Sequence, residues 1–246
     1  MDRDDIPVGH LLTRREALAV LGSTALFVVA GRSRMFFSST ATPPTAAAPS
    51  CIVRPQQTEG PYFVDEKLNR TDIRSDPSDG TVKAGALLTL TFNVSRIASG
   101  VCTPLPGAYV DVWHCDALGV YSDVVDPRFN TRGKKYLRGY QITDAGGAAR
   151  FTSIYPGWYQ GRTVHIHFKI RSAPAASPGF ELTSQLYFDD AVTDRVHARQ
   201  PYAAKGQRTV RNPQDGIFKQ GGSQLLVAVQ EDSRGHHATL NVALQL

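Results

Sequence analysis

From residue 51 onward, apolar and polar residues alternate in short runs that are separated by Pro and Gly. Residues 87–94 and 108–113 show the alternation of half-buried strands most clearly. Further strand-like runs occupy residues 140–143, 149–152, 164–170, 184–188, 224–230 and 238–244. Residues 190–200 favour a short helix. The pattern predicts an all-β fold, a β-sandwich of two mainly antiparallel sheets, with little helix outside an N-terminal signal segment.

A tight turn separates two of these runs. Asp144-Ala145-Gly146-Gly147 lies between residues 140–143 and 149–152, and Asp and Gly favour the turns that reverse a strand. We therefore expect these two runs to form a β-hairpin. The chain shows no internal repeat and no second boundary after residue 51, so we expect one domain over residues 51–246.

The N-terminus has a different composition. Arg14 and Arg15 precede a moderately apolar run, Ala17 to Gly31, and this arrangement resembles the twin-arginine signal of the Tat export route. The apolar run is shorter than the about 20 residues that a membrane-spanning helix needs. A small-residue run, Ala46 to Ala48, follows where a peptidase could cut.

We therefore expect a Tat-like signal segment with a Pro/Ala/Thr linker over residues 1–50. The protein would then be exported and be periplasmic or extracellular. The alternative is an uncleaved segment that anchors the chain, which would be its one contact with a membrane.

Charge and cysteine content narrow the function classes. The formal net charge of +5 is spread along the chain and not concentrated in Lys/Arg runs, so nothing supports nucleic-acid binding. In an exported protein, one disulfide and one buried thiol are the simplest arrangement of three cysteines. Cys51 and Cys102 lie outside the strand-like runs, so we expect them to pair. Cys115 is expected to be a small core residue, and the spacing of the three fits no zinc motif.

Two histidines and two tyrosines form the candidate chemistry. His165 and His167 are separated by one residue, so in a strand their side chains project from the same face. Tyr159 precedes them, and Tyr121 ends another strand-containing segment. Imidazole nitrogens together with strongly donating phenolate oxygens suit ferric iron better than soft or weakly charged metals.

Each part of this pattern has an ordinary explanation when taken alone. A His-x-His pair is weak evidence for a metal site, and an isolated tyrosine at the end of a strand is usually a half-buried aromatic residue. His114 is expected to be structural, because the strand pattern turns it away from its neighbours. The combination of all four groups, with Arg162 between Tyr159 and the histidines, predicts a mononuclear iron site.

The same segments resemble a known enzyme family. Residues 104–121, 139–147 and 151–168 are similar to the intradiol ring-cleavage dioxygenases, which include the protocatechuate 3,4- and catechol 1,2-dioxygenases. The similarity covers roughly residues 51–246 and implies an intradiol dioxygenase β-sandwich domain. It also implies that one Fe(III) per chain is bound by Tyr121, Tyr159, His165 and His167. Tyr155 is a competing candidate, at a position where the family does not keep tyrosine.

The resemblance also implies roles for residues around the iron. Tyr159 would leave the iron when substrate binds and accept a proton from it. Arg162 would stabilise negative charge that develops during the reaction, and Gln185 would orient Arg162. The residues expected to contact the substrate are Gly60, Pro61, Tyr62 and Arg162.

The implied reaction is the cleavage of a catechol-type ring by O2, between its two hydroxylated carbons, to a cis,cis-muconate-type product. The partners are therefore a small aromatic substrate and O2. An oligomer is possible, but the helical dimerisation region of catechol 1,2-dioxygenases has no counterpart here. Two alternatives stay open: a non-catalytic exported β-sandwich binding protein, and a zinc hydrolase that uses His165 and His167. No residue selects one catechol over another.

Overall fold

The computed structural model describes residues 51–246, so the signal segment and linker expected over residues 1–50 lie outside the described residues. Strands dominate the described part. They are β1 (Leu87–Ala98), β2 (Val101–Pro104), β3 (Tyr109–Trp113), β4 (Val125–Asp126), β5 (Phe129–Asn130), β6 (Arg138–Ile142), β7 (Ala148–Ile154), β8 (His165–Arg171), β9 (Glu181–Phe188), β10 (Leu226–Val227), β11 (Val229–Asp232) and β12 (Gly235–Gln245). The helical elements are α1 (Asp190–His197) and the short 3₁₀ segments η1 (Tyr202–Lys205), η2 (Asn212–Gln214) and η3 (Gly222–Leu225).

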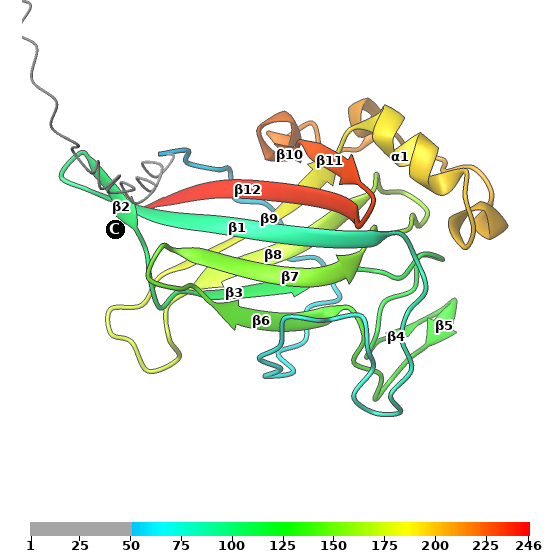
Figure 1. The fold of residues 1–246 in the computed structure, drawn as a ribbon, viewed down its shortest axis with the longest axis horizontal. Helices are drawn as coiled ribbons and strands as arrows, with labels where there is room; N and C mark the ends of the chain where they lie inside the picture. The colour runs from blue at the N-terminus through cyan, green and yellow to red at the C-terminus, as the bar shows by residue number, and fades with distance from the viewer. Residues whose placement is uncertain (1–50) are drawn as a thin grey trace, which may run out of the picture. The chain divides into compact units, whose positions relative to one another are not determined.

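Two five-stranded sheets face one another, which confirms the predicted β-sandwich (Figure 1). We call the sheet with the order β11-β12-β1-β2, in which β7 also pairs with β1, the first sheet. The second sheet has the order β10-β9-β8-β3-β6, and β4 and β5 form a separate small hairpin. Most pairs are antiparallel, as expected, but β1 and β12 run parallel along almost their full lengths. The parallel pairing is possible because the chain passes through the second sheet between these two strands.

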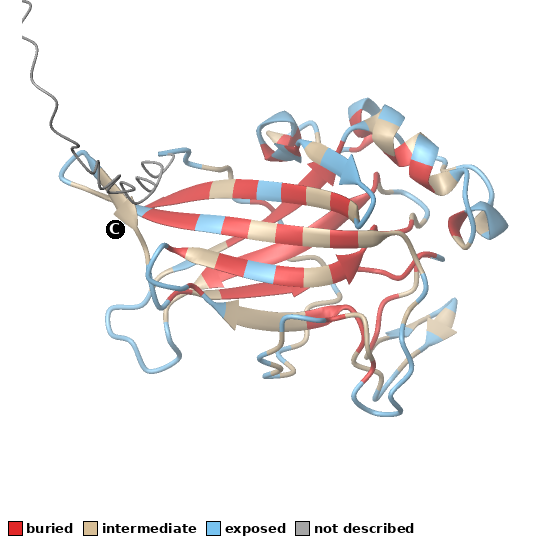
Figure 2. Ribbon diagram, in the orientation of Figure 1, coloured by how far each residue is buried: buried red, intermediate tan, exposed pale blue. Residues whose placement is uncertain are grey.

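The core lies between the sheets. On β1, every second residue from Leu88 to Val94 is buried, and the alternation is visible along the strands of the first sheet in Figure 2. From the second sheet, Ile166 and Phe168 of β8 belong to the same apolar cluster. Phe92 and Phe168 meet with ring centroids 5.3 Å apart. Because side chains alternate along a strand, His165 and His167 must lie on the other face of β8, outside this core.

That outer face of the second sheet is also covered. Six of the seven residues of β8 are buried, and so are the last six of β9. The N-terminal residues of the described chain run along β9: the Gln57 N–H donates to the Thr183 carbonyl and the Ser184 hydroxyl donates to the Pro55 carbonyl. The result is a second shielded region, which is where the candidate site lies.

The expected hairpin between residues 140–143 and 149–152 is wrong. The turn exists, but β6 pairs with β3 in the second sheet and β7 pairs with β1 in the first. The free edge of β6 is occupied by an earlier segment, since the Tyr140 N–H donates to Leu68 and the Arg70 N–H donates to Tyr140. The turn therefore joins the two layers of the sandwich.

The expected single strand over residues 224–230 is also wrong. Its first residues belong to η3, and the remainder divides into β10, which pairs with β9, and β11, which pairs with β12. The apolar residues Leu225 to Val229 run through the end of η3, all of β10 and the start of β11, so their pattern resembles that of one longer strand. The helix expected within residues 190–200 is confirmed as α1.

Cysteine pairing follows the expectation. Cys51 and Cys102 form a disulfide that joins the first described residue to β2, and Cys115 is a buried free thiol. Within residues 51–246, no helix is long and apolar enough to cross a membrane.

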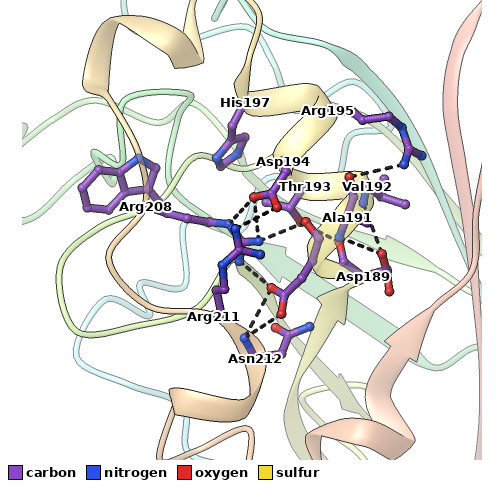
Figure 3. Close-up of polar contacts among 12 residues, drawn as sticks. Asp189, Ala191, Val192, Thr193, Asp194, Arg195, His197, Arg208, Arg211 and Asn212 are labelled. Carbon is purple, nitrogen blue, oxygen red and sulfur yellow. Dashed lines mark hydrogen bonds and ion pairs between the residues drawn. The ribbon is translucent and has the colours of Figure 1, made fainter.

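Charged side chains fasten the segment that follows α1 (Figure 3). Arg208 donates to the carboxylates of Asp190 and Asp194 on this helix. The Asn212 N–H points to Asp190, and the Asn212 side-chain amide donates to the Phe188 carbonyl at 2.8 Å. These contacts hold residues 208–215 against the end of the second sheet.

The two-faced burial of β8 leads to a stability prediction. Phe168→Ala removes a fully buried ring from the core face and should lower the free energy of unfolding by about 3–5 kcal/mol in urea denaturation. Val101→Ala, at a site that is 61% exposed, should change it by no more than about 0.5 kcal/mol. Equal effects of the two changes would contradict the assignment of Phe168 to the core.

Candidate metal centre

The structure brings the four predicted ligand residues together. The Nε2 atoms of His165 and His167 are 3.1 Å apart, and the Tyr159 hydroxyl lies 3.1 Å from His165 Nε2. The Tyr121 ring is 5.8 Å from the Tyr159 ring and 6.3 Å from the His167 ring, between centroids. Residues from β8, from the loop before it and from the loop after β3 thus converge on the outer face of the second sheet.

The histidines owe their directions to β8 and its neighbours. His167 pairs in register with Trp113 of β3, and their rings stack with an interplanar angle of 10° and centroids 5.0 Å apart. His165 Nδ1 donates to the Thr163 carbonyl at 2.6 Å. This hydrogen bond places the ring proton on Nδ1, so that Nε2 presents a lone pair to the site.

Close packing of two loops places the tyrosines. Asp116 Oδ1 accepts the N–H groups of Leu118 and Val120, which tightens the turn that leads to Tyr121. Gly119 has a φ of +80°, and a Cβ there would lie 2.1 Å from the Trp158 carbonyl oxygen. Only glycine therefore lets this turn contact the loop that carries Tyr159.

Burial leaves these groups poorly satisfied without a cation. The Tyr121 side chain is 1% exposed, and its hydroxyl has no hydrogen-bond partner among residues 51–246. Burial raises the pKa of the Tyr121 and Tyr159 phenols. Burial also lowers the pKa of His165 to about 3 and that of His167 well below its ordinary value. Neutral imidazoles are the form that binds metals, and a cation would stabilise the phenolates.

The donor set fits a hard trivalent cation such as Fe(III). Two nitrogen atoms about 3 Å apart can both lie at the roughly 2 Å of a metal–nitrogen bond. Two phenol oxygens add strongly donating anionic ligands on deprotonation. Among the described residues, no group of three or more His, Cys, Asp and Glu side chains is arranged to hold a metal.

Arg162 and Gln185 lie together, as expected. Arg162 Nη2 donates to Gln185 Oε1 at 2.6 Å, and Gln185 Nε2 donates to the Thr58 carbonyl at 2.9 Å. Gln185 is fully buried and pairs in register with His167 across β8 and β9. The glutamine is therefore fixed by the backbone, and it in turn fixes one edge of the guanidinium.

Besides Arg162, three residues were expected to contact the substrate, and two of these three contact the candidate ligands. A Cβ on Gly60, whose φ is +73°, would lie 3.2 Å from His167 Cε1, so this glycine packs closely against the imidazole. The Tyr62 ring lies 4.6 Å from the Tyr121 ring, and its hydroxyl donates to Asp126 at 2.6 Å. Pro61 is exposed.

His114, which was expected to be structural, and Tyr155, the competing ligand candidate, both have structural contacts. His114 Nε2 contacts the Ser153 hydroxyl at 2.7 Å and its Nδ1 donates to the Cys115 carbonyl, so both nitrogens are used inside the protein. The Tyr155 hydroxyl contacts Thr193 at 2.8 Å within the apolar core. The competing ligand Tyr155 is therefore not part of the site.

Two charged residues of the site were missed in the sequence. Arg138 is 2% exposed and donates to the carbonyls of Tyr62 and Ser122, which joins the Gly60–Tyr62 segment to the residue after Tyr121. Asp215, whose side chain is completely buried, accepts from Arg162 Nε at 2.8 Å. An arginine at the start of a strand and an aspartate in a distant turn carry no local signal of such contacts.

Comparison with known proteins gives a consistent result. Residues 58–217 match the sequence profile of a family described as Dioxygenase. The catechol 1,2-dioxygenase 2 of Acinetobacter lwoffii is 32% identical over 161 residues, which cover 55% of this chain and 51% of that protein. The chain thus spans about half the length of the curated relatives it matches.

Solved structures match over more of their length. An intradiol ring-cleavage dioxygenase from Tetranychus urticae is 30% identical with a TM-score of 0.67, over 79% of this chain and 95% of that one. The dioxygenase domain of a dioxygenase–carbohydrate-binding fusion protein from Streptomyces sp. SirexAA-E is 30% identical with a TM-score of 0.54, over 79% and 99%.

His114, a buried histidine outside the ligand set, predicts a pH dependence of stability. Burial lowers the pKa of His114 to about 4 in the folded protein, whereas the unfolded chain titrates near its ordinary value of 6.5. Between these values the unfolded state binds more protons, so the free energy of unfolding should fall as pH is lowered from 6.5 toward 4. Urea denaturation at several pH values should show a shallower dependence in His114→Gln, by up to about 1.4 kcal/mol per pH unit.

The control for this measurement is His237→Gln, at a half-buried position that contacts Asp232. This variant should keep most of the change in unfolding free energy between pH 6.5 and 4. If wild type and His114→Gln show the same change with pH, protonation of His114 is not its cause.

Proposed function

The chain belongs to the intradiol ring-cleavage dioxygenase family, and from this membership we propose that it is an Fe(III) enzyme that cleaves catechol-type rings with O2. The observation that carries the proposal is the convergence of His165 and His167 with Tyr121 and Tyr159, in which the Tyr121 hydroxyl has no hydrogen-bond partner in the described part of the chain. The product would be a cis,cis-muconate-type dicarboxylate, with one oxygen atom of O2 added at each carbon of the broken bond.

We assign one Fe(III) per chain to these four residues. When bound, the ion would act as a Lewis acid that binds both oxygens of a doubly deprotonated catechol and withdraws electron density from it, which would make the ring reactive toward O2. The protein supplies the neutral imidazoles, the two phenols and a shielded surface.

The two tyrosines are not equivalent. Tyr121 is fully buried, whereas Tyr159 is only partly buried and its hydroxyl lies 3.1 Å from His165 Nε2. Tyr159 therefore has more freedom to move and to exchange a proton. Once a catechol approaches, a Tyr159 phenolate can accept one of its hydroxyl protons, since phenol and catechol oxygens have similar basicity.

Arg162 provides positive charge beside the reacting ring. Its guanidinium is held by Gln185 and Asp215, so its orientation does not have to be established during the reaction. A single preorganised donor of this kind typically lowers a barrier by about 3 kcal/mol.

Apolar side chains exclude water from the same region. Trp113, Cys115 and Tyr121 form a buried cluster separate from the sandwich core. The partly buried residues packed against it are Tyr62, Phe63, Val124, Phe129 and Tyr159. Low polarity around the ligands strengthens their electrostatic interactions and protects reactive species from water.

Oxygen uptake is the direct test of the proposed activity. The iron-loaded protein should consume one O2 per catechol and show a broad visible band from phenolate-to-iron charge transfer. A panel of catechols that differ in ring substituents, measured with an oxygen electrode, should contain at least one substrate. A protein that stays colourless after loading with iron, and consumes no O2 with any member of the panel, would favour a non-catalytic binding module.

Removal of one phenol tests the ligand assignment. Tyr121→Phe should weaken iron binding at least tenfold and shift or diminish the visible band, because outer contacts alone are worth ~10–100-fold in metal affinity. Tyr155→Phe is the matched control, since it removes a buried hydroxyl that contacts Thr193 instead. Identical spectra and iron affinities for the two variants would refute Tyr121 as a ligand.

A further inference from the structure

We propose that Asp215 is a positioning residue that sets the direction of the Arg162 guanidinium and, through Thr163, the orientation of the His165 ring. The inference rests on the proposed function and extends it to a residue that contacts none of the four ligand side chains directly. Asp215 lies in the turn after η2, fifty-three residues from Arg162 in the sequence.

The Asp215 carboxylate is saturated with four hydrogen bonds. Its Oδ2 accepts from Arg162 Nε and from the Thr163 N–H, both at 2.8 Å. Its Oδ1 accepts from the N–H groups of Ile217 and Phe218, at 2.7 Å and 2.9 Å. The side chain is completely buried. One oxygen therefore faces the site, and the other holds the turn that presents it.

Asp215 and Gln185 hold Arg162 at two different nitrogens. Asp215 contacts Nε and Gln185 contacts Nη2, so the planar guanidinium is fixed in both position and rotation. The glutamine alone would leave rotation about that single contact possible. The carboxylate adds the second point and also balances the buried positive charge.

The same carboxylate oxygen reaches the metal ligand through the backbone. Thr163 donates its N–H to Asp215, and its carbonyl accepts from His165 Nδ1 at 2.6 Å. The Thr163 hydroxyl also donates to Asn212 Oδ1 at 2.7 Å. Asp215 thus fixes the residue that orients the His165 ring, so one carboxylate serves both the charged residue and a ligand.

Retention of this segment against the sheet does not require Asp215. Arg208 already fastens it to α1, as Figure 3 shows, and the Asn212 side chain fastens it to the end of β9. A buried ion pair is also a poor source of net stability, because desolvation offsets most of its attraction. The placement of Asp215 against Arg162 therefore points to orientation as its main role.

The test uses Asp215→Asn in the iron-loaded full chain. An amide has only one acceptor oxygen, so either Arg162 and Thr163 or the two turn N–H groups would face an NH2 group. We expect kcat for a catechol substrate to fall about 10–100-fold, while the dissociation constant of the substrate under anaerobic conditions changes less than about threefold. We also expect iron to be lost to a chelator about tenfold faster, which is a readout independent of turnover.

Asp111→Asn is the matched control. Asp111 accepts from Arg171 Nε at 2.7 Å, and the two side chains are buried to nearly the same extent as those of Asp215 and Arg162. Arg171 lies at the opposite end of β8 from His165. This variant should lose stability to a similar degree but keep the wild-type kcat and rate of iron loss.

A double-mutant cycle separates orientation from a general structural effect. If Asp215 acts on turnover through Arg162, Asp215→Asn should lower kcat less than twofold further in an Arg162→Ala background. A further drop as large as that in the wild type would overturn the proposal, as would an Asp215→Asn variant with wild-type kcat and iron retention.

If Asp215→Asn does not fold, Arg162→Lys tests the same contact while Asp215 stays in place. A lysine cannot contact both Asp215 and Gln185 with a rigid fork, so its kcat should be close to that of Arg162→Ala. Full activity of Arg162→Lys would overturn the proposal. A wild type and an Asp111→Asn control that both lack turnover and iron binding would mean that the proposed function itself is wrong.

Discussion

Strand β8 has two buried faces, and the rest of the structure depends on that constraint. Its even and odd positions point to opposite sides, so Ile166 and Phe168 complete the sandwich core while His165 and His167 are held over the second sheet. If β8 paired with its neighbours one residue out of register, the imidazoles would point into the core, and Ile166 and Phe168 would lie at the site. The register that stabilises the fold is therefore the register that assembles the ligands.

Burial leaves some polar side-chain atoms of residues 51–246 without hydrogen-bond partners, and half of these atoms lie at the site. Six buried side-chain atoms among the described residues lack a hydrogen-bond partner. Three of them belong to Trp113, Tyr121 and His167, which contact one another. Since most buried polar groups in proteins are paired, unpaired groups that cluster in this way indicate a location built for something other than stability. The surrounding contacts of Arg138, Gln185 and Asp215 are, by contrast, well satisfied.

Features that depend on residues close together in the chain could be predicted from the sequence. Alternation identified most of the strands, and the spacing of His165 and His167 identified the face they share. Partners that are distant in the chain escaped prediction. The turn at Asp144–Gly147 has the local features of a hairpin, yet β6 and β7 separate because Leu68 and Arg70 occupy the edge of β6. Asp215 and Arg138 were missed for the same reason, because their roles arise only when loops from different parts of the chain meet.

The disulfide between Cys51 and Cys102 has a consequence at some distance from both sulfur atoms. It closes a loop with a sequence separation of 51, and that loop contains Gly60 and Tyr62, which line the metal centre. A covalent closure of this length restricts the unfolded chain by about 4 kcal/mol in the chain-entropy account. The wall of the site is thus one side of a covalent ring whose other side is β1. Oxidation of two thiols that lie outside the metal centre thereby contributes to the order of a segment that packs against it and contains no sulfur.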